Sequence, residues 1–139
     1  MKKTLTEIQD EVIKNYRITI VKDSKCRSRT HAHVKQRKIC KWKSASSIQS
    51  TFTLFHEIGH VMTYKGTMRR CESEYAATVW AIDECNKYNL TIPSTLIDRY
   101  QRYIYRELDR GIRRGGLDYP TREELRLPYN EARILRRLL

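Results

Sequence analysis

Three long segments with helical periodicity, separated by short breaks, constrain the fold of this chain more than any other feature. They span residues 48–64, 71–88 and 94–113, with Gly66 after the first and Pro93 before the third. Glycine favours the end of a helix and proline its first turn, so each break is expected to fall between two helices. Short connections bring consecutive helices back against one another, and we therefore expect a mostly helical core.

The N-terminal part combines one further helix with two extended segments. Residues 5–15 place apolar side chains at helical spacing, whereas residues 16–21 are rich in β-branched side chains and favour a strand. Residues 31–42 form a second extended piece with lysine and arginine on both faces, as is typical of an edge strand. The expected fold class is therefore α+β, with a small antiparallel or mixed sheet beside the helices.

Length and composition indicate one domain without a membrane segment. The 139 residues, 40% of them hydrophobic, suit a single core, so residues 1–139 are assigned to one domain. No apolar run approaches the roughly 20 residues needed to cross a bilayer, and the residues after Met1 are too polar for a secretory signal. The four cysteines form no CxxC pair, which favours free thiols and a cytoplasmic protein; they are Cys26, Cys40, Cys71 and Cys85.

The positive charge is concentrated in two regions. The formal net charge is +12, and residues 22–43 carry nine lysines and arginines against Asp23 alone. A second basic stripe runs along the predicted helix 94–113, from Arg99 to Arg113 at steps of three and four residues. Both regions would attract polyanions or acidic proteins through salt-sensitive forces, so nucleic acid is one expected partner class.

The segment His56-Glu57-Ile58-Gly59-His60 matches the HExxH pattern within a predicted helix. Residues four apart lie on one helical face, so two imidazoles can bind one Zn²⁺ at about 2.0–2.1 Å. The intervening Glu57 can accept a proton from a water activated by the metal and return it to a leaving nitrogen. These residues predict a zinc-dependent hydrolase, with Glu57 as general base and Gly59 permitting close packing of a neighbouring element.

A catalytic zinc needs a third protein ligand, and the next predicted helix offers two candidates near its start. Glu74 shares one face with Ala77 and Ala81, whose small side chains would let that helix press against the HExxH helix. Glu72 points elsewhere and suits the acidic first turn of a helix. We therefore expect Glu74 as the third ligand, with Cys71 a buried thiol.

The stretches Phe52–His60 and Glu74–Ala81 resemble the metallopeptidases of the ImmA/IrrE type. The resemblance implies a small α+β gluzincin with His56, His60 and Glu74 as zinc ligands and Glu57 as general base. It also implies cleavage of a specific intracellular protein, such as a repressor or regulator of a phage or mobile element. The chain departs from the family pattern at Trp80, where phenylalanine is usual.

Substrate contacts are less constrained by the sequence. Residues 35–42 are the candidate edge strand for pairing with an extended substrate, and their charge favours one that is acidic or negatively flanked. Four side chains are candidates to stabilise an oxyanion, and spacing does not select among them: His31, His33, Tyr64 and Tyr75.

Two other function classes fit parts of the sequence. One is a basic nucleic-acid-binding or regulatory protein on the same scaffold, with a structural or vestigial zinc. The other is a small interaction protein, such as an inhibitor, that has lost turnover. Glu57 separates these classes from an enzyme, because a binding module has no need of it.

Overall fold

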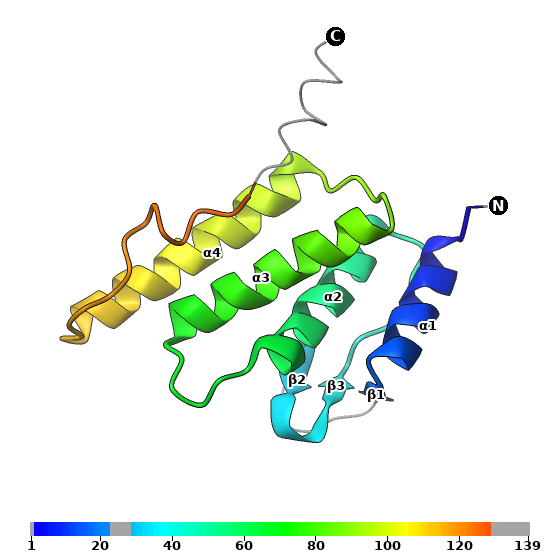
Figure 1. Ribbon diagram of the computed structural model, residues 1–139, viewed down its shortest axis with the longest axis horizontal. Coiled ribbons are helices and arrows are strands. Elements are labelled where there is room, and N and C mark those ends of the chain that lie inside the picture. Colours follow the sequence, from blue (N-terminus) through cyan, green and yellow to red (C-terminus); the bar gives the residue numbers. More distant parts are fainter. Residues whose placement is uncertain (1, 23–28, 129–139) are drawn as a thin grey trace, which may run out of the picture.

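The computed structural model describes residues 2–22 and 29–128 and has a mostly helical α+β fold (Figure 1). Its helices are α1 (Leu5–Asn15), α2 (Ile48–Thr63), α3 (Arg70–Lys87) and α4 (Ser94–Arg113). Each end agrees with the sequence prediction to within one residue. Helix α3 packs against both α2 and α4, and α1 packs against α2. None of the helices in the described part of the chain is long and apolar enough to cross a bilayer.

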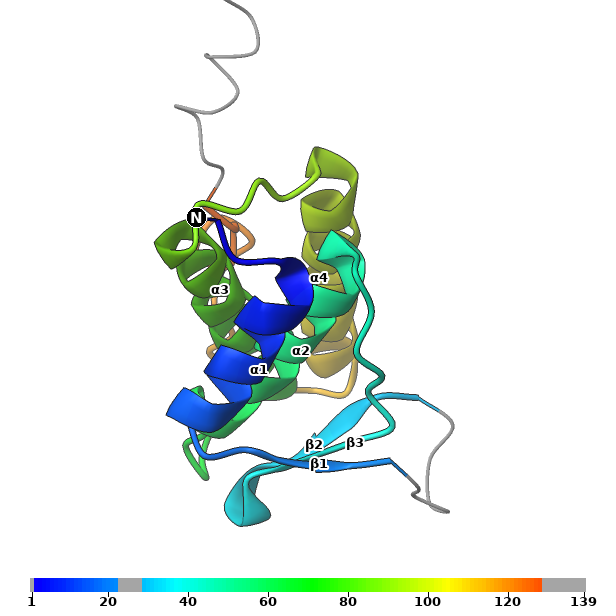
Figure 2. The ribbon, with the colours of Figure 1, turned by 90° about the vertical axis from the view of Figure 1, so that its right-hand side faces the viewer.

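A small mixed sheet lies on one side of this helical layer (Figure 2). Its strands are β1 (Thr19–Val21), β2 (His31–His33) and β3 (Lys38–Cys40), in the order β1-β3-β2. Strand β3 is central: it pairs parallel to β1 and antiparallel to β2. Strand β2 contacts α2 and brings one edge of the sheet to that helix.

The prediction of one continuous strand over residues 31–42 is wrong. A 3₁₀ turn at Val34–Gln36 divides it into β2 and β3, and Arg37 adopts the left-handed region with φ 52°. That conformation is uncommon outside glycine, asparagine and aspartate, none of which occurs in this segment. The predicted strand over residues 16–21 likewise begins only at Thr19, because Arg17 has φ 53°.

The core is centred on α2. Phe52, Leu54, Phe55 and Ile58 are all 0% exposed, and fully burying a side chain of this size contributes about 1.5–3 kcal/mol. The buried amide of Gln9 fixes α1 to the start of this helix, since its nitrogen donates to the Ala45 carbonyl and the Thr51 hydroxyl, each at 2.8 Å. The buried apolar side chains and the Gln9 hydrogen bonds therefore hold α2 in place without a bound ligand.

Gly59 allows α3 to approach α2 more closely than any other residue would. A Cβ added to Gly59 would lie 2.5 Å from the carbonyl oxygen of Ala77 and 3.0 Å from its Cα. Both contacts are with backbone, which has little freedom to move aside. The predicted close packing through Gly59 and the small residues of α3 is therefore present.

The segment after α4 folds back across the helices, as Figure 1 shows in orange. Arg69, the N-cap of α3, donates to the carbonyls of Leu117 and Asp118 at 2.7 and 2.8 Å. Farther along, Gln101 of α4 bonds the backbone of Leu125 and Leu127. Thr121 and Glu124 stand at the three-residue spacing of a capping box, which predicts a helix start. This pairing forms, but it closes turns rather than a helix. The sequence also predicts a helix over residues 130–139, which lies outside the described residues.

Candidate metal and catalytic site

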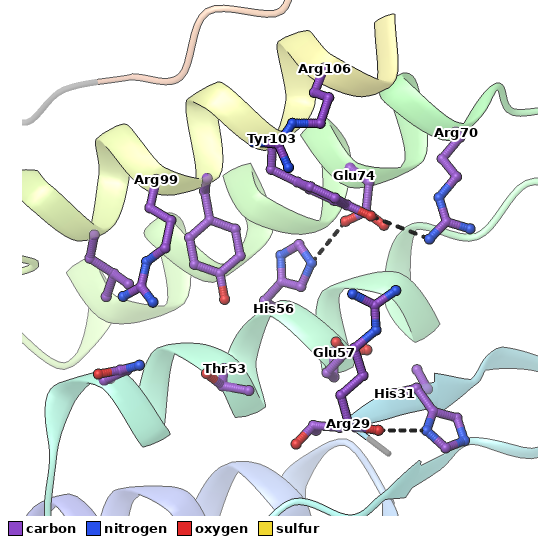
Figure 3. Close-up of a pocket in the computed structure, with 15 residues that line it drawn as sticks. Arg29, His31, Thr53, His56, Glu57, Arg70, Glu74, Arg99, Tyr103 and Arg106 are labelled. Atoms are coloured by element: carbon purple, nitrogen blue, oxygen red, sulfur yellow. Dashed lines mark hydrogen bonds and ion pairs between the residues drawn. The ribbon is translucent and has the colours of Figure 1, made fainter. Parts of the chain in front are cut away.

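The two histidines of the HExxH segment and the glutamate of the next helix converge. His56 and His60 are one turn apart on α2, and Glu74 lies in the second turn of α3. The Nε2 atoms of His56 and His60 lie 3.0 and 3.2 Å from the same Glu74 Oε2 atom. Figure 3 shows His56 and Glu74 facing each other across the gap between the helices.

Hydroxyl groups hold the other nitrogen of each imidazole. The Thr78 hydroxyl donates to the Glu74 carbonyl at 2.7 Å, so it can accept a hydrogen bond from His56 Nδ1 at 3.1 Å. His60 Nδ1 lies 3.2 Å from the Ser73 hydroxyl. When Nε2 also carries a hydrogen, it donates to Glu74; a neutral imidazole with its hydrogen on Nδ1 would instead present the Nε2 lone pair to a metal, as histidines that bind metals do. No sequence pattern pointed to Thr78 or Ser73, because their contacts depend on how α3 packs against α2.

The centre is buried and favours the ionised carboxylate. His56 is 5% exposed and Glu74 7%. Burial opposes ionisation of Glu74, but the hydrogen bonds and charges of His56 and His60 outweigh it and hold the pKa of Glu74 well below its usual range. Burial likewise opposes the charge on His60, but Glu74 raises its pKa. The cluster thus provides an anionic oxygen and two imidazoles in a dry setting.

This donor set fits a zinc ion. Bond lengths of about 2.0–2.1 Å place the ligands of a tetrahedral zinc roughly 3.3 Å apart, and the two measured separations of 3.0 and 3.2 Å are close to that. Cys71 is buried but belongs to neither of the metal-ligand clusters found among the described residues. Glu72 pairs with Arg69 at 3.6 Å and is likewise outside both clusters. Three protein ligands leave a coordination position open, as a catalytic zinc requires.

Glu57 lies on α2 beside the two histidines and lines an adjoining cleft. Burial raises the pKa of Glu57 above its ordinary value, although the nearby His56 and His60 lower it in part. A carboxylate in such a place is a stronger base than one in water, because its charged form is less well solvated. Glu57 is therefore suited to accept a proton inside the cleft.

The cleft encloses about 720 Å³ and is bordered by α2, α3, α4 and strand β2. Four arginines line it: Arg29, Arg70, Arg99 and Arg106. Glu57 and Glu74 are the carboxylates among its lining residues. Tyr100 packs its ring on His56, with centroids 4.8 Å apart. Figure 3 shows Arg70 and Tyr103 beside Glu74 and Arg29 beside Glu57, whereas Arg99 lies farther along α4.

The sequence-based expectations for substrate contacts need correction. Residues 35–42 include β3, whose backbone is paired on both sides, so this segment cannot accept a substrate strand. Strand β2 is the edge beside the cleft, and His31 and Ala32 line it. Among the oxyanion candidates, His31 borders the cleft, whereas His33, Tyr64 and Tyr75 do not. Tyr100 and Tyr103 do border it, and sequence spacing alone gave no reason to choose them.

The chain matches no protein-family model, and neither the curated proteins nor the solved structures contain a match.

Proposed function

We propose that this chain is a zinc-dependent metallopeptidase that hydrolyses a peptide bond in a specific protein. The observation that carries the proposal is the approach of His56 Nε2 and His60 Nε2 to the same Glu74 Oε2 atom, at 3.0 and 3.2 Å, next to a cleft lined by Glu57. A purely structural ion would not require an open cleft with a desolvated carboxylate at this position. The resemblance to ImmA/IrrE-type peptidases supports the same conclusion.

The chemistry divides between the metal and the protein. When bound, Zn²⁺ would lower the pKa of a coordinated water to about 7 and polarise a carbonyl. Glu57 accepts the proton of the attacking water and returns it to the departing nitrogen. Burial raises the pKa of Glu57, and so makes it a better proton acceptor than an exposed carboxylate.

Tyr103 is the best-placed donor for the developing oxyanion. Its hydroxyl oxygen accepts a hydrogen bond from Arg70 at 3.3 Å, so its own hydrogen is free to point into the cleft. The Arg70 charge also makes the phenol a stronger donor. Loss of one oxyanion donor typically lowers kcat by about 10²–10³, and we expect a loss in that range for Tyr103→Phe.

The substitution Glu57→Gln tests the catalytic proposal most directly. It keeps the shape of the side chain and removes its basicity, so cleavage should fall about 10²- to 10⁴-fold with zinc content and fold unchanged. The assay uses quenched-fluorescent peptide libraries, with zinc measured by elemental analysis. Chelation should abolish cleavage and added zinc should restore it.

Glu72→Gln is the matched control, since Glu72 lies outside the cluster and the cleft. It should cleave at the wild-type rate. Full activity in Glu57→Gln would contradict the proposed mechanism, and a folded protein that binds no zinc would contradict the metallopeptidase assignment itself.

The charge of the cleft supports an acidic or negatively flanked substrate. Arg99 and Arg106 line the cleft from α4, and neither forms an ion pair with a carboxylate in the described part of the chain. Both side chains are exposed, so each unpaired guanidinium group can reach a carboxylate of a bound peptide, with the modest, salt-sensitive attraction of a surface charge. Arg110, farther along the same stripe, is instead paired with Glu107 at 3.1 Å.

Neutralising these arginines should lower the preference for acidic peptides. Arg99→Gln and Arg106→Gln are each expected to reduce kcat/KM on Asp/Glu-rich peptides about 2- to 5-fold, mainly through KM. Arg102→Gln is the control, because Arg102 is exposed on α4 but does not line the cleft. Equal rates on acidic and basic libraries in the wild type would overturn the proposed preference.

By the same resemblance, we place the substrate among cytoplasmic regulators of a phage or mobile element. Binding to nucleic acid through the regions 22–43 and 99–113 stays a prediction. It is tested by retention of DNA or RNA at moderate salt.

A further inference from the structure

A second group of metal-binding side chains lies on the β2–β3 hairpin. The antiparallel register places His31 directly opposite Cys40 and His33 opposite Lys38. Residues opposite each other share a face of the sheet, as do residues two apart on one strand. His31, His33 and Cys40 therefore project to the same side, and one ligand atom from each lies within 4.8 Å of the others.

The imidazole of His31 is buried with one nitrogen unsatisfied. Its Nδ1 lies 3.0 Å from the carbonyl oxygen of Arg29, which can only accept, so Nδ1 carries the hydrogen. Its Nε2 then has a lone pair, yet this atom is buried without a partner among the residues that the structure describes. Leaving a buried polar atom unpaired destabilises the fold. A histidine whose far N–H is bonded to a backbone carbonyl is also the usual form of a metal ligand.

The other two side chains complete a donor set suited to zinc-like ions. Cys40 is 3% exposed and His33 is exposed, with its ring 5.0 Å from that of His31. Thiolate and imidazole together select Zn²⁺ and related transition metals over Mg²⁺ or Ca²⁺. The exposed His33 side chain is free to rotate towards an ion, and solvent on that side can supply a fourth ligand.

We propose that His31, His33 and Cys40 form a second site for a zinc-class transition metal, independent of the His56-His60-Glu74 cluster. Binding displaces the Cys40 thiol proton to solvent and satisfies His31 Nε2. A bound ion would fix β2 to β3. Since His31 and Ala32 border the cleft, it would also fix that wall of the cleft.

Cobalt titration of the full chain tests this site. Co²⁺ substitutes for Zn²⁺, and a thiolate ligand gives it a sulfur-to-metal charge-transfer band in the near ultraviolet. The cluster on α2 and α3 contains no sulfur, so the band reports a cysteine ligand outside that cluster. We expect the wild type to show the band, with a total uptake of two Co²⁺ per chain, and added Zn²⁺ to remove the band.

Three variants identify the side chains that give rise to the band. Cys40→Ala should abolish it, and His33→Ala, at an exposed position that leaves the fold intact, should weaken the hairpin affinity at least tenfold. Cys71→Ala is the control, because Cys71 is equally buried but belongs to neither cluster. No band in the folded wild type, a band retained in Cys40→Ala, or unchanged affinity in His33→Ala would each overturn the proposal.

Discussion

The two clusters of candidate metal ligands are supported in contrasting ways. On α2 and α3, each imidazole has a hydroxyl partner on Nδ1, and the carboxylate between them is almost fully buried. On the hairpin, His31 has one backbone partner, Cys40 is buried, and His33 faces solvent. The comparison indicates that the helical cluster is preorganised, whereas the hairpin cluster needs rotation of at least one side chain before it can bind.

Substitution of Glu74 should give the largest difference between the two clusters, because metal binding should be lost at one and kept at the other. Glu74→Gln replaces the anionic oxygen with a neutral amide of the same shape, so zinc should no longer bind on α2 and α3 at micromolar concentrations. The cobalt–thiolate band of the hairpin should remain. Loss of both signals in a folded variant would mean that the clusters are not independent.

Gly59→Ala should disturb the helical cluster through packing alone. The added methyl group would meet the Ala77 carbonyl at 2.5 Å, so the free energy of unfolding should fall by about 1–3 kcal/mol. Chemical denaturation measures this. Gly66→Ala, where the nearest atom is the Tyr64 hydroxyl at 3.8 Å, should change stability by less than about 0.5 kcal/mol.

Thr78→Val tests whether the hydroxyl support of His56 matters for binding. It keeps the volume but removes the acceptor for Nδ1, and zinc affinity should fall about 10- to 100-fold. Thr63→Val is matched, because Thr63 also donates to the carbonyl four residues earlier and lies away from the cluster. An equal fall in both variants would show that helix distortion, rather than ligand support, is responsible.

The smallest effect is expected at the exposed end of the hairpin cluster. His33→Asn should alter the free energy of unfolding of the metal-free protein by less than about 0.5 kcal/mol, because the side chain is exposed. His60→Asn should cost about 1–3 kcal/mol, since it breaks a partly buried contact with Glu74. Similar losses in the free energy of unfolding at His33 and His60 would contradict the stronger support inferred for the helical cluster.

The same contrast explains what could be predicted from the sequence. His56 and His60 are one helical turn apart whatever the rest of the chain does, and Glu74 follows from the small residues on its face of α3. Those relations are local, so the helices and the helical cluster were predictable. Glu74, and not Glu72, lies against the two histidines, whereas its role as a metal ligand stays a prediction.

The sheet could not be predicted from local sequence patterns alone. His31 meets Cys40 only because the chain reverses at Val34–Gln36 and Arg37 adopts a left-handed conformation. No glycine, asparagine or proline marks that reversal, so the segment looked like one strand. Thr78 and the cleft tyrosines were missed for a related reason: their roles depend on how α3 and α4 pack.

The returning segment after α4 ties the start of the Glu74 helix to a distant part of the chain. Arg69 bonds the carbonyls of Leu117 and Asp118, stacks on Tyr119, and directly precedes α3. Chains shortened to end before Leu117 would keep every candidate ligand and Glu57, yet lose the contacts that anchor the start of α3, one turn before Glu74. Minimal versions of this protein should therefore extend at least through Leu127, even though the residues with chemical roles end at Arg106.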